Sequence, residues 1–151
     1  MNLIFNKKNI TILTVTLIIS IILITFVAGM QIHKTERQNK IAAESYYDVL
    51  QTIRQDKKSI KSAKNKMEDI LSNNPNIKIS NIIAISIAQL HFELEEYEDS
   101  IKIYKSLILN LKSKDSIMPI VLSGLKMNYE KLKLLDKLKE TNDQLEKMGI
   151  F

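Results

Sequence analysis

One stretch without charge limits what this chain can fold into. Residues 9 to 33 contain no Asp, Glu, Lys or Arg and stand between Lys8 and Lys34. A helix rises about 1.5 Å per residue, so residues 10–30 would cover the roughly 30 Å hydrocarbon core of a membrane. We therefore expect a single transmembrane helix over residues 10–30.

A cleaved signal peptide is the rival interpretation of this segment. Lys7 and Lys8 resemble the basic start of a signal peptide, and Val27, Ala28 and Gly29 resemble a cleavage site. The apolar part of a signal peptide is only about 7 to 15 residues long, however, and this one is longer. A core helix of a soluble protein is a third interpretation, but the remaining residues could hardly surround it. We expect an uncleaved anchor.

Basic residues flank the segment on both sides, so their distribution does not decide its orientation. The first segment is short and easily retained in the cytoplasm, and we therefore expect the rest of the chain on the outer side. The expected organisation is a short cytoplasmic segment at residues 1–9, the transmembrane helix at 10–30 and a helical domain at 31–151.

The composition of the domain favours helices with surfaces of mixed charge. The chain has only three Gly and two Pro, so turns are few. It has 22 basic and 17 acidic residues, and two of the basic ones, Lys7 and Lys8, precede the apolar segment. The domain is therefore nearly balanced, and we expect no nucleic-acid partner. The absence of cysteine excludes disulfides, thiolate metal sites and thiol catalysis.

Apolar residues recur every three to four residues through the domain, which predicts an all-α fold. The short polar segments between these patterns imply that successive helices are antiparallel neighbours. Residues 80–94 are apolar on most faces and are expected to be buried on several sides. The expected helices cover 34–55, a segment from Ile60 to the SNNP sequence, 80–94, 96–111, 117–135 and 136–148.

Part of the domain matches the tetratricopeptide repeat pattern. In residues 83–107 the leucine position, the two small positions where helices approach, and the aromatic position are all occupied by suitable residues. Three positions depart from the pattern, because Ala84, His91 and Glu95 replace the usual Trp, Tyr and turn Gly. The matching residues are Ile87, Ala88, Ser100 and Tyr104.

Weaker matches flank this unit on both sides. In the following unit Gly124 stands at a plausible point of close approach between helices. The preceding unit has suitable residues in both of its helices and a closing proline, namely Tyr47, Leu50, Ala63, Met67 and Pro75.

An amino-terminal anchor, a long first helix and two to three degenerate repeats together resemble the YfgM-like tetratricopeptide family, the ancillary subunits of the bacterial SecYEG translocon. The resemblance covers nearly the whole chain. It implies an α-solenoid of antiparallel helix pairs anchored in the bacterial inner membrane, with the repeats in the periplasm. It also implies protein partners, namely the translocon, chaperones or client polypeptides.

No arrangement of side chains in the sequence is typical of catalysis or metal binding. His33 and His91 have no partner at ligand or triad spacing, and His91 is expected to pack in the core. The sequence has no Gly-rich phosphate loop and no nucleophile elbow. We therefore expect a protein that is not an enzyme and that uses no cofactor, metal or small-molecule substrate.

The register of the repeats predicts a groove lined by the first helix of each pair, which suits an extended peptide or a partner helix. In the alternative, the carboxy-terminal helices cover its apolar members Ile82, Ile85 and Phe92. The residues expected to face the groove are Ile82, Ile85, Gln89, Phe92 and Glu93, with Asp48 and Thr52 from the first unit.

These features predict a membrane-anchored adaptor that binds proteins or nascent chains near a translocon. Two other classes stay open at this point. One is a structural subunit of a membrane complex, and the other is a receptor that is anchored at its amino terminus and faces the cytoplasm.

Overall fold

The computed structural model describes residues 7–55, 59–74, 77–112 and 115–150, with the side chains of 17–53 in the first of these ranges. All regular structure in these ranges is helical, so the predicted all-α class is confirmed. The helices are α1 (Lys7–Gln55), α2 (Ile60–Asn73), α3 (Ser80–Glu93), α4 (Tyr97–Asn110), α5 (Met118–Lys131) and α6 (Leu135–Lys147).

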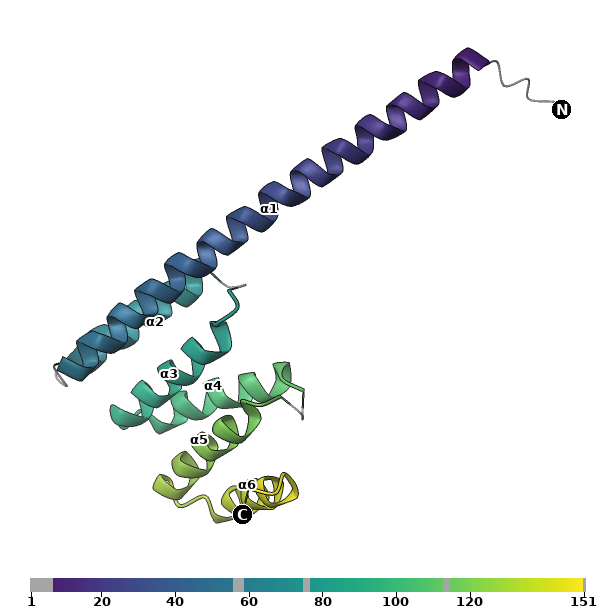
Figure 1. The fold of residues 1–151 in the computed structure, drawn as a ribbon. Helices are drawn as coiled ribbons and strands as arrows, with labels where there is room; N and C mark the ends of the chain where they lie inside the picture. The colour runs from purple at the N-terminus through teal and green to yellow at the C-terminus, as the bar shows by residue number, and fades with distance from the viewer. Residues whose placement is uncertain (1–6, 56–58, 75–76, 113–114, 151) are drawn as a thin grey trace. The chain divides into compact units, whose positions relative to one another are not determined.

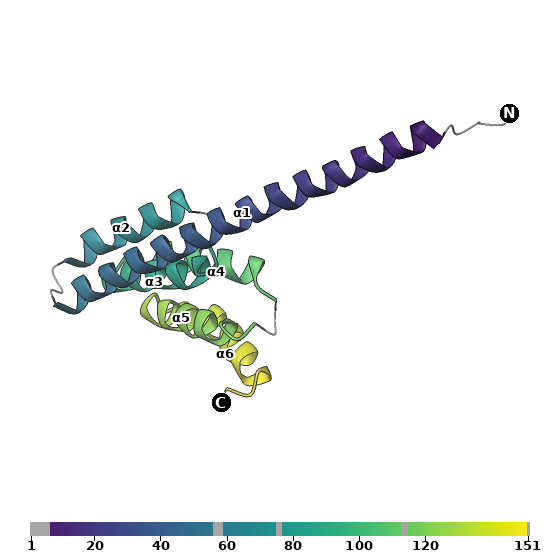
Figure 2. The ribbon, with the colours of Figure 1, turned by 45° about the horizontal axis from the view of Figure 1, so that its top comes forward.

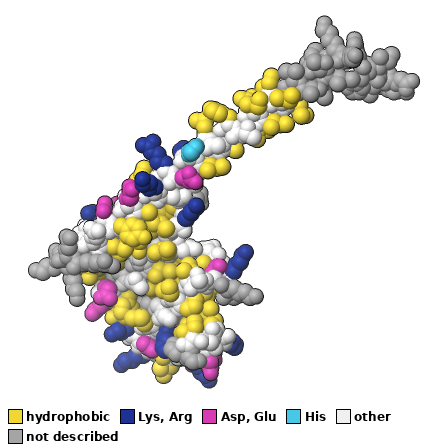
Figure 3. Space-filling model, in the orientation of Figure 1, with side chains coloured by type: hydrophobic (Ala, Val, Ile, Leu, Met, Phe, Trp, Pro, Cys, Tyr) yellow, Lys and Arg dark blue, Asp and Glu magenta, His cyan; other side chains and the backbone are white. Residues whose placement is uncertain are grey.

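The chain divides into two compact units, Met1–Lys40 and Ile41–Phe151. In the first unit the large apolar side chains of α1 are exposed, and Figure 3 shows them as a yellow stretch without charged neighbours. α1 is long and apolar enough to cross a membrane, and no other helix of the described ranges is. Thr25 Oγ1 donates to the carbonyl of Ile21, so this hydroxyl is paired within the helix.

In the second unit each helix from α2 onward packs against the next one along the chain. Figures 1 and 2 show this order from two directions. One core cluster joins the end of α1 to α2 and α3 and contains the fully buried Met67 and Ile83. A second cluster joins α3, α4 and α5 around Tyr104 and Val121, and a third joins α5 to α6 at Leu145.

The pair α3–α4 and the pair α5–α6 repeat one geometry. α5 begins at Met118, which is 38 residues after the first residue of α3, Ser80, and both helices are 14 residues long. The joint before each pair repeats as well, because the N–H of Ser80 donates to Ile77 at 3.1 Å and that of Met118 donates to Asp115 at 3.0 Å. The second unit is thus a repeat-like array of helices with a spacing of 38 residues between these two pairs.

The turn inside each pair is also repeated. Its middle residue has a positive φ, 62° at Glu95 and 56° at Lys133. The N–H of the next residue donates to the carbonyl five positions earlier, at 2.9 Å in both turns. Glycine is usual at such a helix end because it has no Cβ, and here backbone hydrogen bonds hold a glutamate and a lysine in the same conformation.

The small residues of the repeat pattern lie where helices approach closely. Ser100 Oγ donates to the carbonyl of Ala88 at 2.8 Å, and both residues are fully buried. Gly124 faces Tyr104, whose ring would collide with a Cβ at that position. Because Gly124 belongs to α5 and Tyr104 to α4, this close approach joins two successive pairs.

Two details of the predicted helices are wrong. The fifth helix ends at Lys131 and not at Leu135, because the turn around Lys133 interrupts it. The tyrosine that packs in the first unit of the pattern is Tyr46, which is 7% exposed, whereas Tyr47 is 63% exposed. The closing proline of that unit, Pro75, lies outside the described residues.

Candidate protein-binding groove

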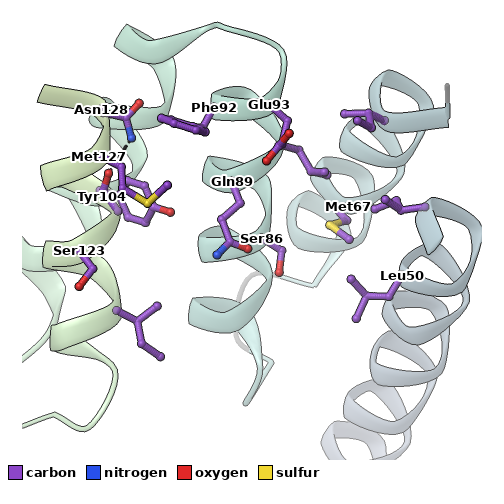
Figure 4. A pocket seen from close by; sticks show the side chains of 15 residues that line it. Leu50, Met67, Ser86, Gln89, Phe92, Glu93, Tyr104, Ser123, Met127 and Asn128 are labelled. Atoms are coloured by element: carbon purple, nitrogen blue, oxygen red, sulfur yellow. Dashed lines mark hydrogen bonds between the residues drawn. The ribbon is translucent and has the colours of Figure 1, made fainter. Parts of the chain in front are cut away.

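A groove of about 710 Å³ crosses the second unit. Figure 4 shows side chains of α3 between those of α5 on one side and those of α1 and α2 on the other. The lining residues are Leu50, Ile53, Ile60, Met67, Ser86, Gln89, Leu90, Phe92, Glu93, Tyr104, Ile120, Ser123, Gly124, Met127 and Asn128.

The groove has apolar walls and a polar strip on the helices that line it. Half-exposed apolar side chains such as Ile120, at 50% exposure, and Met127, at 49%, border it on α5. The polar strip consists of Ser86 and Gln89 on α3 with Ser123 on α5, and Glu93 is the one charged residue among the described residues of the lining. Such a surface offers contact area to apolar groups and a few hydrogen-bonding partners that can fix their position.

Three of the predicted groove residues, Gln89, Phe92 and Glu93, do line it. Ile82 lies on α3 and is 46% exposed, but it is not one of the lining residues. Ile85 is buried in the cluster that joins α3, α4 and α5. The helix face does not decide this outcome, because a turn of about 100° per residue aligns 82 with 86, 89 and 93, and 85 with 92. The groove extends along α3 only from Ser86 to Glu93, so it includes Phe92 and leaves out Ile82.

Asp48 and Thr52 are exposed on α1 and do not line the groove. Leu50 and Ile53 line it instead. Tyr46, and not Tyr47, is the buried tyrosine of this part of α1. Tyr46 also hydrogen-bonds through its hydroxyl to Ser86 Oγ at 2.8 Å, which ties α1 to α3 beside the groove.

A buried polar network below the groove was missed in the sequence. Asn128 on α5 is fully buried, and its Nδ2 donates to Ser100 Oγ at 3.0 Å and to the carbonyl of Gly124 at 2.8 Å. No spacing rule connects residues 28 positions apart, so only the fold brings Asn128 to Ser100. The one available signal was an asparagine in an otherwise apolar helical pattern, which is a sign of a buried polar group with partners.

The predicted core position of His91 is confirmed, but its neighbours are charged. His91 is 8% exposed, and its Nδ1 lies 2.6 Å from a carboxylate oxygen of Glu96. Lys64 on α2 donates to the same carboxylate at 2.7 Å. The hydrogen bond from Lys64 holds the pKa of Glu96 below its ordinary value, against the effect of desolvation and with a smaller contribution from His91. This cluster ties the turn between α3 and α4 to α2.

Burial dominates the chemistry of Tyr104, the aromatic residue at the back of the groove. Its side chain is 2% exposed, and desolvation raises the pKa of its phenol to about 12. Tyr104 is therefore neutral at physiological pH and acts as a packing residue. Among the described residues no group of three or more His, Asp or Glu side chains is arranged to hold a metal ion.

Comparison of this chain with models of known protein families, with curated proteins and with solved structures found no match.

Proposed function

We propose that this protein is a membrane-tethered adaptor whose helices form a degenerate tetratricopeptide-type solenoid, and that its groove binds polypeptides. The observation that carries the proposal is a groove of about 710 Å³ with apolar walls and a polar strip in a repeat-like helical unit. Its lining offers hydrogen-bonding side chains and apolar area to a peptide. The described lining residues do not form an arrangement that is typical of a catalytic site.

Tethering supports the same proposal. α1 can hold the second unit at a membrane, so clients delivered to that membrane meet the groove at a high effective concentration. Modest affinity is then sufficient. The family resemblance of the sequence suggests the bacterial inner membrane, with the second unit in the periplasm and with the translocon, its chaperones or emerging polypeptides as partners.

A photo-crosslinking amino acid at Gln89, an exposed lining residue, tests the binding proposal in native membranes. The matched control carries the same group at Leu109, which is 86% exposed and does not line the groove. We expect polypeptide adducts from position 89 and none of the same masses from position 109. Identical adducts from both positions, or none from position 89, would contradict the proposal.

The orientation is tested with two single-cysteine variants, Asn2→Cys and Asn110→Cys. The chain has no cysteine of its own, so each label reports one site. We expect an impermeant thiol reagent to label position 110 on intact spheroplasts and position 2 only after lysis. Labelling at position 2 alone would instead favour a receptor that faces the cytoplasm.

The competing proposal is a structural subunit whose span and first helix pair with another membrane protein while its own carboxy-terminal helices fill the groove. The exposed Gln89 separates the two, because Gln89→Arg places a charge in the groove without removing a core side chain. The adaptor should fold normally and lose its adducts, which are then monitored from Met127, another lining residue. A structural subunit should instead be destabilised, because the charge would have to enter a filled groove.

A further inference from the structure

One hydrogen-bond acceptor in the groove has no partner. Asn128 Oδ1 is the one buried side-chain nitrogen or oxygen of the described residues that makes no hydrogen bond. Asn128 is fully buried, lines the groove, and extends from α5 toward Phe92 (Figure 4). A buried acceptor without a donor lowers the stability of the fold. This atom is therefore a candidate acceptor for a hydrogen bond from a bound ligand.

The orientation of the amide is fixed by its other contacts. Nδ2 has two hydrogens, and they are used on Ser100 Oγ and on the carbonyl of Gly124. The Ser100 hydroxyl donates to the carbonyl of Ala88 and has no hydrogen left for Asn128. A flipped amide would place Oδ1 against the Gly124 carbonyl, so the oxygen must point away from these groups.

The occupant of the groove must therefore bring a slender donor together with apolar side chains. A helix satisfies its own N–H groups beyond its first turn, whereas an extended segment presents a free main-chain N–H at every second residue on one side. The polar strip of Ser86, Gln89 and Ser123 supplies further partners for such a backbone. Extended apolar peptide fits these demands better than a helix.

We propose that the groove binds an extended apolar peptide segment and that Asn128 Oδ1 accepts a hydrogen bond from one main-chain N–H of that segment. This inference rests on the proposed function and names the chemistry of its ligand. Ser100 is a positioning residue in this arrangement, because it holds Nδ2 and leaves Oδ1 for the peptide.

The test uses the full-length protein in lipid nanodiscs and a fluorescein-labelled octapeptide of Val, Thr and Ser with one central Phe. The Phe fixes the register of the peptide, and the β-branched residues favour an extended chain. Fluorescence anisotropy gives the affinity. Each main-chain N–H is then replaced in turn by an ester oxygen, which removes one donor and little else.

We expect one or two ester positions to weaken binding about three- to tenfold, the effect of one net hydrogen bond, and the other positions to have little effect. Asn128→Leu should weaken the parent peptide to a similar extent and abolish the difference between parent and ester peptide. Asn110→Leu is the matched control, because it makes the same change at an exposed residue of α4 that does not line the groove, and it should leave both affinities unchanged. Circular dichroism establishes that both variants are folded.

Three results would overturn the inference. They are equal affinity of all ester peptides, an unchanged ester effect in folded Asn128→Leu, and tighter binding of a helix-stapled version of the octapeptide. If the octapeptide does not bind while position 89 still crosslinks polypeptides, the inference fails and the proposed function stands. If neither binding nor crosslinking occurs, the proposed function itself fails.

Discussion

Gly124 lies against the ring of Tyr104, and this contact makes the position intolerant of any side chain. We expect Gly124→Ala to destabilise the second unit by about 1–3 kcal/mol, because one methyl group must displace a packed aromatic ring. Urea unfolding followed by circular dichroism measures the change. Gly29→Ala is the control, since a Cβ at Gly29 meets no atom within 4 Å. Equal unfolding midpoints for the two variants would show that the ring can move aside freely.

Glu96 makes the stability of the second unit sensitive to acid. Its pKa is held below the ordinary value of 4.5 in the folded state, chiefly by Lys64. A carboxyl with a depressed folded pKa stabilises the protein above its unfolded pKa, and this contribution is lost as the pH falls through the folded pKa. We therefore expect the wild type to lose more stability than Glu96→Gln when the pH falls below 4.5.

Urea midpoints measured between pH 3 and pH 7, a range that brackets the ordinary carboxyl value, test this expectation. The matched control is Glu130→Gln, which changes an exposed carboxyl on α5, outside the cluster around Glu96. Its curve should run parallel to that of the wild type. Parallel curves for Glu96→Gln and the wild type would contradict the assignment.

Much of the residue-level packing could be predicted because it depends on local type and spacing. Ala88, Ser100 and Tyr104 were placed correctly from the repeat pattern, since small and aromatic residues at those intervals are needed wherever two helices meet. The repeat register on α1 was not, because the pattern was laid on Tyr47 and the adjacent Tyr46 is the buried one. Helical spacing favours Tyr46, which lies four residues after the buried Ala42 and three before the buried Val49. Its hydroxyl partner Ser86 is 40 residues away in the chain.

At the scale of the elements, we predict that the residue with positive φ in each of the two turns lowers the stability of the second unit. Glu95 and Lys133 occupy a conformation that disfavours a Cβ, so Glu95→Gly and Lys133→Gly should each stabilise the second unit by about 0.5–1 kcal/mol. Lys105→Gly is the control, because it changes an exposed residue in the middle of α4 and should destabilise by about 0.5–1 kcal/mol. Thermal unfolding measures all three. Loss of stability at both turns would contradict their left-handed geometry.

The bounds of most helices could be predicted from the sequence. The exception is the end of α5, and the turn around Lys133 explains it. Segments rich in Asn, Pro, Ser and Asp separate α2 from α3 and α4 from α5, and such residues interrupt helical spacing. The end of α5 has only Lys and Leu around Lys133, so the apolar spacing continues through a real break. The predicted groove residues depended on the repeat register, and those that line the groove, Gln89, Phe92 and Glu93, come from α3, where the repeat pattern matches best.

At the scale of the whole molecule, the anchor predicts that the full-length chain and a fragment without α1's apolar part behave differently in membrane extraction. The full-length protein should stay in the membrane fraction after alkaline carbonate extraction, because α1 exposes a continuous apolar surface. A fragment that begins at Ile41, the start of the second compact unit, should be extracted. A full-length chain shortened to a product that begins near Met30 and released in soluble form would instead indicate a cleaved signal peptide.

The packing of each helix against its neighbours predicts that damage stays local. Leu145→Ala removes the fully buried side chain of the α5–α6 cluster and should cost about 2–4 kcal/mol. In a repeat array that loss should raise amide hydrogen exchange in α5 and α6 first and leave α2 and α3 protected. Met67→Ala, at the other end, should show the reverse pattern. Uniform loss of protection in both variants would indicate a single cooperative core.

The repeated turns and joints keep the same backbone hydrogen bonds while the side chains around them have changed almost completely. Along the 14 positions of α3 and α5, only the third, Ile82 and Ile120, carries the same residue. The two pairs therefore share their main-chain geometry and their alternation of buried and exposed positions, and they do not share residue identities. A chain of this kind can therefore exchange most of its side chains and keep its fold, because backbone hydrogen bonds hold the turns and joints.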